Sequence, residues 1–393
     1  MPLAEKNSTR VPAAGARRLD WLDALRGWAV LGVVLTHSGG ASHSTGITQK
    51  ISSSGHYGVQ LFFIVSALTI SLTYDSHIVR YGRGIRSQFA WLIKRFFRIA
   101  PLYYLAAFLY PILNYAMYLQ SHHRYGLLTG VPQIVANLLF IHTWVPSANN
   151  SVVPGGWSIG VEMFFYLLVP FIWLITPRKL HVRAAILGLA SVALLCITQL
   201  ANKAVTGTWY VPNDTYFYYW FPTEAPVILI GLILYFLHGI KLRNQESSQR
   251  TVPYRVGFLL CIPAALYCGT GEKWMPILSP SILAIGFVLL ILGLNEQIKS
   301  ILVNRFSVFL GQISFSVYIL HFAVLDGLQG FLQMIHFRHF TPATLPAVFT
   351  FAVLVTSGLG YLSKKFVEDP FIAYGHKLSQ TVAEAKIEKP TAS

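Results

Sequence analysis

The fold is decided by the stretch LDWLDALRGWAVLGVVLTH, residues 19–37. This stretch is about as long as the roughly 20 residues that a helix needs to cross a lipid bilayer. It carries Asp23, Arg26 and His37 among residues that are otherwise mostly apolar or small. Ionisable groups inside a membrane span are costly, so each of them marks a functional candidate. We therefore expect a membrane helix with one polar face that has a functional role.

The rest of the chain is typical of a membrane protein. Of its 393 residues 54% are hydrophobic and 11% are charged, and the mean hydropathy is +0.53, which exceeds that of ordinary soluble domains. These values predict an all-α, polytopic integral membrane helix bundle with about ten transmembrane helices. The predicted spans are residues 19–37, 57–74, 97–119, 157–176, 183–201, 222–240, 253–270, 279–296, 308–333 and 345–367.

The basic residues predict how the chain is oriented. The net charge is +15, but Lys and Arg cluster in alternate connections between the apolar runs. This positive-inside pattern indicates membrane topology and predicts cytoplasmic N and C termini, with no nucleic acid as partner. We expect a cytoplasmic N-terminal segment over 1–18, a transmembrane domain over 19–371 and a mobile cytoplasmic tail over 372–393. Within the connection 120–156, the apolar run 134–144 is too short to cross a bilayer and predicts a re-entrant or interfacial segment.

The polar residues of the first span fall on one helix face. Asp23 and Arg26 are three residues apart and can pair. His37 follows Arg26 by eleven residues, which is nearly a whole number of turns and about 16 Å along the axis. These three residues form a polar stripe that runs from one end of the helix towards the other. A structural ion pair with a histidine near the helix end is the alternative.

Two further spans carry polar strips. GGWSIGVEMFFY, residues 155–166, places Ser158, Glu162 and Tyr166 at i, i+4 and i+8. A carboxylate at this depth serves either as a structural anchor or in binding and catalysis. The span over 308–333 repeats the pattern with Ser314, Tyr318 and His321. For His321 the alternative to a functional role is a buried core histidine whose hydrogen bonds are made within the protein.

A third feature is the segment KRFFRIAP, residues 94–101. Arg95 and Arg98 fall on one face at the predicted cytoplasmic end of a span. Guanidinium groups bind phosphate through paired, charge-assisted hydrogen bonds. Arginines at such positions also set orientation or contact anionic lipid, and this second interpretation stays open.

In this order, the motifs resemble the membrane acyltransferase-3 family, which contains bacterial O-antigen, peptidoglycan and exopolysaccharide O-acetyltransferases. The resemblance runs from Leu19 to Pro370. Its parts are residues 19–37, GVQLFFIVSALTIS, KRFFRIAPLYY, GGWSIGVEMFFY, LGQISFSVYILHF and FVEDPF. The sequence departs from the family pattern at Ala67, where Gly is usual, and after Phe322, where Pro is common.

The resemblance implies a membrane-bound O-acyltransferase. It would transfer an acyl group, usually acetyl, from cytoplasmic acyl-CoA to a hydroxyl of a carbohydrate or glycolipid at the outer face, without a metal. The roles assigned from the motifs and the polar strips are catalysis for His37, Arg26 and Glu162, donor binding for Arg95, Arg98 and Asp23, and acceptor binding for Trp157, Ser158, Tyr166, Tyr318 and His321. His37 would act as general base or accept the acyl group itself.

The expected partners are a carbohydrate or lipid-linked glycan acceptor and membrane lipids, and the oligomeric state stays open. The expected location is the cytoplasmic (inner) membrane, crossed many times. One alternative is a transporter in which Asp23, Glu162 and His37 form a relay. Another is a membrane scaffold or regulator without activity.

Overall fold

The computed structural model describes residues 19–121, 130–177, 179–212, 215–243, 251–270, 275–294, 296–336 and 341–384. Within these ranges the chain is helical and contains no strand, which confirms the predicted fold class. The α-helices are α1 (Asp20–Ala41), α2 (Gly46–Ser53), α3 (Gly58–Tyr81), α4 (Ile85–Ser121), α5 (Val131–Leu138), α6 (Gly156–Ile175), α7 (Leu180–Thr206), α8 (Tyr216–Tyr219), α9 (Phe221–Arg243), α10 (Thr251–Thr270), α11 (Ser279–Leu292), α12 (Glu296–Leu302), α13 (Arg305–Gln312), α14 (Ser314–Met334), α15 (Thr344–Ser363) and α16 (Asp369–Glu384). Short 3₁₀ turns are η1 (Ser54–Tyr57), η2 (His142–Trp144) and η3 (Met275–Leu278), and a π-helical turn, Lys364–Glu368, joins α15 to α16.

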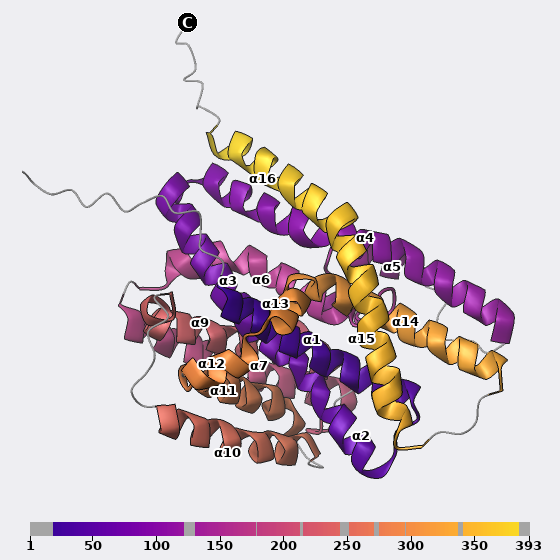
Figure 1. Cartoon of the computed structure of the whole chain (residues 1–393). Coiled ribbons are helices and arrows are strands. Elements are labelled where there is room, and N and C mark those ends of the chain that lie inside the picture. Colours follow the sequence, from indigo (N-terminus) through magenta and orange to yellow (C-terminus); the bar gives the residue numbers. More distant parts are fainter. Residues whose placement is uncertain are drawn as a thin grey trace, which may run out of the picture.

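Helix α1 lies in the middle of the bundle (Figure 1). It packs against α3, α13, α14 and α15. The packing with α13 is unusually close, because a Cβ on Gly27 would lie 2.1 Å from the carbonyl oxygen of Ser307, and one on Gly311 would lie 1.7 Å from that of Asp23. Small residues at such crossings let two backbones approach each other in a membrane bundle. The polar face of α1 is therefore fixed within the protein interior.

Seven helical segments of the described chain are long and apolar enough to cross a membrane. They are Gly46–Tyr81, Ile85–Ala116, Gly156–Ile175, Leu180–Thr206, Tyr216–Gly239, Ser314–Met334 and Thr344–Glu384. The predicted spans 19–37, 253–270 and 279–296 are not among them. Helix α1 falls short because its charged and small residues lower its hydropathy, and its central place in the bundle explains why it tolerates them. The apolar runs of α10 and α11 are shorter.

The structure breaks the predicted span 308–333 into two helices, so the prediction of one continuous helix was wrong. Helix α13 ends at Gln312 and α14 begins at Ser314. The break falls at Ile313, whose φ of −106° and ψ of 7° lie outside the α-helical range. At the other end of α13, Asn304 and Ser307 form a reciprocal capping box that starts the helix. The apolar content alone did not show this break.

The apolar run 134–144 forms the short helix α5 and the turn η2, as expected for a segment that does not cross the bilayer. The chain reverses at Phe140, which has a φ of 57°. The hydroxyl of Tyr103 donates to the Asn137 side-chain oxygen (2.7 Å), and Nε2 of His142 donates to the Gly156 carbonyl (2.9 Å). These bonds tie the segment made of α5 and η2 to α4 and α6.

The tail expected to be mobile from residue 372 is helical as far as Glu384. Helix α16 packs along α4, as Figure 1 shows. Gly375 permits the close approach, since a Cβ there would lie 2.5 Å from the Cβ of Phe97. At the preceding π-helical turn, the buried Glu368 accepts a hydrogen bond from Ser316 on α14. Low apolar content suggested mobility, whereas this helix packs through the small residues Gly375 and Ser379, which are buried. Residues 385–393 lie outside the described residues.

Candidate functional site

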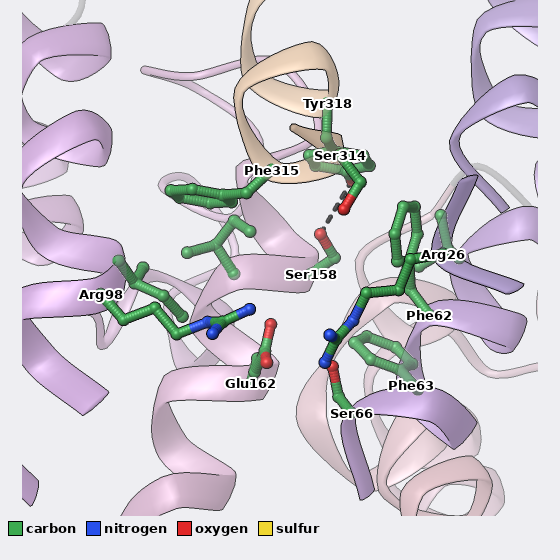
Figure 2. Close-up of a pocket in the computed structure, with 13 residues that line it drawn as sticks. Arg26, Phe62, Phe63, Ser66, Arg98, Ser158, Glu162, Ser314, Phe315 and Tyr318 are labelled. Carbon is green, nitrogen blue, oxygen red and sulfur yellow. Dashed lines mark hydrogen bonds between the residues drawn. The ribbon is translucent and has the colours of Figure 1, made fainter. Parts of the chain in front are cut away.

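A pocket with polar and aromatic walls lies between α1, α3, α4, α6 and α14. The space between its walls is about 580 Å³, including the part open to solvent. Figure 2 shows Arg98 and Glu162 pointing towards each other, with Arg26 facing them from the opposite wall. The lining residues are Arg26, Val59, Phe62, Phe63, Ser66, Arg98, Ile99, Ser158, Ile159, Glu162, Ser314, Phe315 and Tyr318.

Arg26 is held by polar groups on two helices. Its Nη2 donates to the Thr69 hydroxyl on α3 (2.9 Å), and its Nη1 lies 3.6 Å from a carboxylate oxygen of Asp23. The predicted i, i+3 pair thus exists, and Asp23 is buried beside it. The guanidinium also interacts electrostatically with Arg98 and Glu162. Two positive charges and one negative charge therefore meet in one pocket, an arrangement suited to an anionic ligand.

The two arginines of α4 have different surroundings. Arg98 is exposed and lines the pocket. Arg95 lies deeper: its Nη2 donates to Thr73 on α3 (2.9 Å), and its guanidinium lies over the rings of Trp91 (5.4 Å) and Tyr166 (5.9 Å). Such stacking is typical of a structural arginine. Arg98 is therefore the arginine of this pair that is accessible to a ligand in the pocket.

The polar strip of α6 is formed as predicted. The Tyr166 hydroxyl donates to Glu162 (2.7 Å), which leaves the other carboxylate oxygen for the pocket. One turn earlier, the hydroxyls of Ser158 and Tyr318 are 2.8 Å apart, and Tyr318 also donates to the carbonyl of Gly155 (3.0 Å). Gly155 has a φ of 74°, a conformation that favours glycine. These bonds link α6 to α14 at one end of the pocket.

His37 and His321 form a pair just beyond Tyr318. Their ring centroids are 5.2 Å apart, and the ring of Phe322 lies 4.3 Å from His37 and 4.1 Å from His321. Nδ1 of His321 lies 2.6 Å from the Tyr318 carbonyl, which can only accept a hydrogen bond, so this nitrogen carries the proton. In the neutral ring, Nε2 then has a free lone pair. That atom is buried and has no hydrogen-bond partner among the described residues.

The predicted site residues therefore fall into two neighbouring groups. Arg26, Arg98, Ser158, Glu162 and Tyr318 line the pocket, whereas His37 and His321 do not. Tyr318 connects the groups, because its hydroxyl lines the pocket and its carbonyl holds His321. Asp23, Arg95 and Tyr166 support the pocket from behind. Trp157 contacts Tyr219, with 4.7 Å between ring centroids, and lies outside the lining.

The sequence reasoning did not pick out the lining residues of α3, which are Val59, Phe62, Phe63 and Ser66. They all lie in the quoted motif GVQLFFIVSALTIS, so the signal was present without a polar pattern to mark individual positions. Ala67, one of the two positions that depart from the family pattern, faces α9. A Cβ built on Gly231 of α9 would lie 2.7 Å from the Cβ of Ala67. Phe322, at the other departure, covers the histidine pair. In the chain as far as it is described, no three His, Cys, Asp or Glu side chains converge in a way that could hold a metal ion.

Apolar helices long enough to cross a membrane, arranged around a pocket lined by charged and aromatic side chains, define a multi-pass membrane protein with an internal polar pocket. A family model described as "Acyltransferase domain" (Acyl_transf_3) matches residues 19–362. The chain belongs to this acyltransferase-3 family.

Relatives with assigned names are distant. The chain is 24% identical over 388 residues to SACOL0978 of Staphylococcus aureus (strain COL), which carries a provisional O-acetyltransferase name. It is 22% identical over 382 residues to the O-acetyltransferase OatA of S. aureus (strain NCTC 8325 / PS 47). Both alignments cover 92% of this chain, and the chain spans 58% of the length of each relative.

Proposed function

We propose that this chain is an O-acetyltransferase of the cytoplasmic membrane. It transfers an acetyl group from cytoplasmic acetyl-CoA to a hydroxyl of a carbohydrate or lipid-linked glycan at the outer face. The names of the relatives support acetyl transfer to oxygen. The observation that carries the proposal is the pair His37 and His321 directly beyond a pocket lined by two guanidinium groups.

The pocket suits the donor. A CoA molecule is anionic because of its phosphates. Arg98 is an exposed cation on the pocket wall and is the last residue of the basic segment 80–98. Arg26 lies deeper, at the level of Thr69. In our proposal Arg98 binds a donor phosphate, and Arg26 stabilises the negative charge that develops on the thioester oxygen. Arg95 acts as a positioning residue, because Thr73 and two aromatic rings already hold it.

The histidines suit the acceptor chemistry. The hydroxyl oxygen of the acceptor attacks the thioester carbon, a C–O bond forms, and the C–S bond breaks to release the CoA thiolate. His37 takes the hydroxyl proton and then delivers it to the thiolate. Nε2 of His321 can only accept a hydrogen bond, so it can hold one N–H of His37 and leave the other nitrogen as the base. A sugar hydroxyl is too weak a nucleophile without such help.

The donor must reach the histidines past Tyr318. His37 lies about 16 Å from Arg26 along α1, as judged from the helical rise. The pair Ser158 and Tyr318 stands between the pocket and His321. We propose that the thin pantetheine arm displaces this hydrogen bond when it extends from the pocket. The phosphates then stay near Arg98 while the thioester lies beside His37.

The test uses the purified protein with acetyl-CoA labelled in the acetyl group, and surface glycan from the source organism as acceptor. We expect His37→Ala to abolish labelling of the glycan while the protein remains folded, as judged by circular dichroism. His181→Ala is the matched control, because His181 is exposed at the start of α7 and outside the proposed site. Labelling by His37→Ala at the wild-type rate would reject the assignment. Absence of labelling by the wild-type protein would reject the function itself.

A further inference from the structure

A buried polar pair that the proposed mechanism does not use lies between α3 and α9. Nε2 of Gln60 donates to one carboxylate oxygen of Glu224 at 3.4 Å, which is a long hydrogen bond. Gln60 is 2% exposed and Glu224 is 0% exposed. The second oxygen of Glu224 and the side-chain oxygen of Gln60 have no hydrogen-bond partner among the described residues. Two buried acceptors are thus left without a donor.

Such an arrangement is costly in a folded protein. A buried acceptor without a donor lowers the stability of the folded protein by roughly 1–3 kcal/mol. Most buried polar atoms in native structures do have hydrogen-bond partners. The described chain supplies donors at other carboxylates within the helix bundle. Asp75, for example, accepts from Nε1 of Trp173 (2.7 Å) and from the Tyr235 hydroxyl. The incomplete set at Glu224 therefore calls for a donor from outside the chain.

The pair is surrounded by aromatic rings. Tyr218 and Tyr318 both lie within electrostatic range of Glu224. Tyr219 packs on Trp157 with 4.7 Å between ring centroids. Aromatic faces beside a few convergent polar groups are typical of small-molecule sites. Pyranose rings match both components, because their C–H faces pack on aromatic rings and their hydroxyls donate hydrogen bonds.

The position of the pair fits the acceptor rather than the donor. Gln60 precedes Thr73, the partner of Arg95, by 13 residues on α3, which is about 20 Å along the helix. The pair is therefore remote from the basic end of α3. It lies on the side of Trp157, whose neighbour Ser158 contacts Tyr318, the residue that holds His321. A ligand at Glu224 would thus adjoin the proposed reaction centre by way of Tyr318.

We propose that Gln60 and Glu224 bind two hydroxyl groups of a carbohydrate acceptor, with Trp157 and Tyr219 packing on the sugar ring. This inference rests on the proposed function and names the acceptor site for it. The sugar enters by displacing Tyr218, which lies on the single helical turn α8. The two unsatisfied oxygens then gain the donors that they lack in the ligand-free chain.

The test measures the rate of acetyl transfer against the concentration of surface polysaccharide, extracted from the source organism after deletion of the gene for this chain. We expect Glu224→Gln to raise the polysaccharide concentration for the half-maximal rate about tenfold, as the loss of a hydrogen bond predicts. Gln60→Met is expected to act in the same direction. The acetyl-CoA concentration for the half-maximal rate should stay within about twofold, because neither Gln60 nor Glu224 is among the residues proposed to bind the donor.

Asp75→Asn is the matched control, since it also turns a membrane-embedded carboxylate into an amide. We expect it to lower thermal stability and leave the dependence on polysaccharide unchanged. Wild-type polysaccharide dependence in folded Glu224→Gln, or in folded Gln60→Met if the first variant does not fold, overturns the inference while the proposed function stands. Equal changes in the acetyl-CoA and polysaccharide dependences also overturn it. Absence of transfer by the wild-type protein rejects the proposed function, and the inference with it.

Discussion

The close crossing of α1 and α13 makes Gly311→Ala a sharp test of the architecture. A Cβ at Gly311 would lie 1.7 Å from the carbonyl oxygen of Asp23, whereas ordinary contact begins near 3.4 Å. The obstacle is backbone, so no side-chain rotation relieves the overlap. The two helices must separate by roughly the difference between those distances. Overpacking of this kind typically costs about 1–3 kcal/mol of the free energy of unfolding.

The same substitution should also reduce activity. Asp23 and Arg26 lie on the displaced stretch of α1, and Arg26 lines the pocket. A misplacement of about 1 Å in a catalytic arrangement can lower a rate roughly 100-fold. We therefore expect Gly311→Ala to lower both the melting temperature and the rate of acetyl transfer, and the loss of rate should persist at temperatures where the variant is fully folded.

The assays are thermal unfolding in detergent, followed by tryptophan fluorescence, and transfer from labelled acetyl-CoA. Gly327→Ala serves as the control, because nothing lies within 4 Å of a Cβ at Gly327 on α14. Alanine within a helix is favoured over glycine by about 0.5–1 kcal/mol, so the control should match or exceed wild-type stability. If Gly311→Ala melts and reacts like Gly327→Ala, the close contact of α1 with α13 does not exist.

Three further predictions concern the pocket and the segment made of α5 and η2. Gly160→Ala places a Cβ 2.7 Å from Nε2 of His142 and should lower the melting temperature, and a Gly160→Ala protein with wild-type stability would contradict the packing of η2 on α6. Tyr103→Phe removes a buried hydroxyl that donates to Asn137 on α5 at 2.7 Å and should cost about 1–3 kcal/mol in unfolding measurements; an unchanged unfolding free energy argues against that bond. Arg98→Ala should weaken acetyl-CoA binding in calorimetry more than Arg95→Ala does, whereas Arg95→Ala should be the less stable protein; the reverse order would exchange their roles.

Much of the fold could be predicted because apolar length and helical spacing are local properties. Several predicted spans agree with the helices that form. The span 157–176 differs from α6 by one residue at each end, and 183–201 differs from α7 by three residues at one end and five at the other. The same reasoning could not separate α13 from α14, because the backbone change at Ile313 leaves the apolar content of the segment unaltered. It also missed the packing of α16, which depends on the distant surface of α4.

The site was predicted in part for the same reason. Residues that repeat along one helix, such as Ser158, Glu162 and Tyr166, could be read from spacing. The spacing could not predict which helices face one another. It therefore did not show that Arg98 lies near Glu162 or that His37 lies near His321. The free Nε2 of His321 depends on a bond to a backbone carbonyl, which no side-chain pattern encodes. Glu224 carried a readable signal, a carboxylate within an apolar span, and was passed over.

The π-helical turn Lys364–Glu368 sets the rotational phase of everything that follows it. Removing one residue there would leave a continuous helix but rotate α16 by about 100° relative to α15. Gly375 would then point away from Phe97, and a bulkier neighbour would meet α4 in its place. Natural variation at this junction should therefore preserve the residue count between Ser363 and Asp369 more strictly than the identity of the side chains between them.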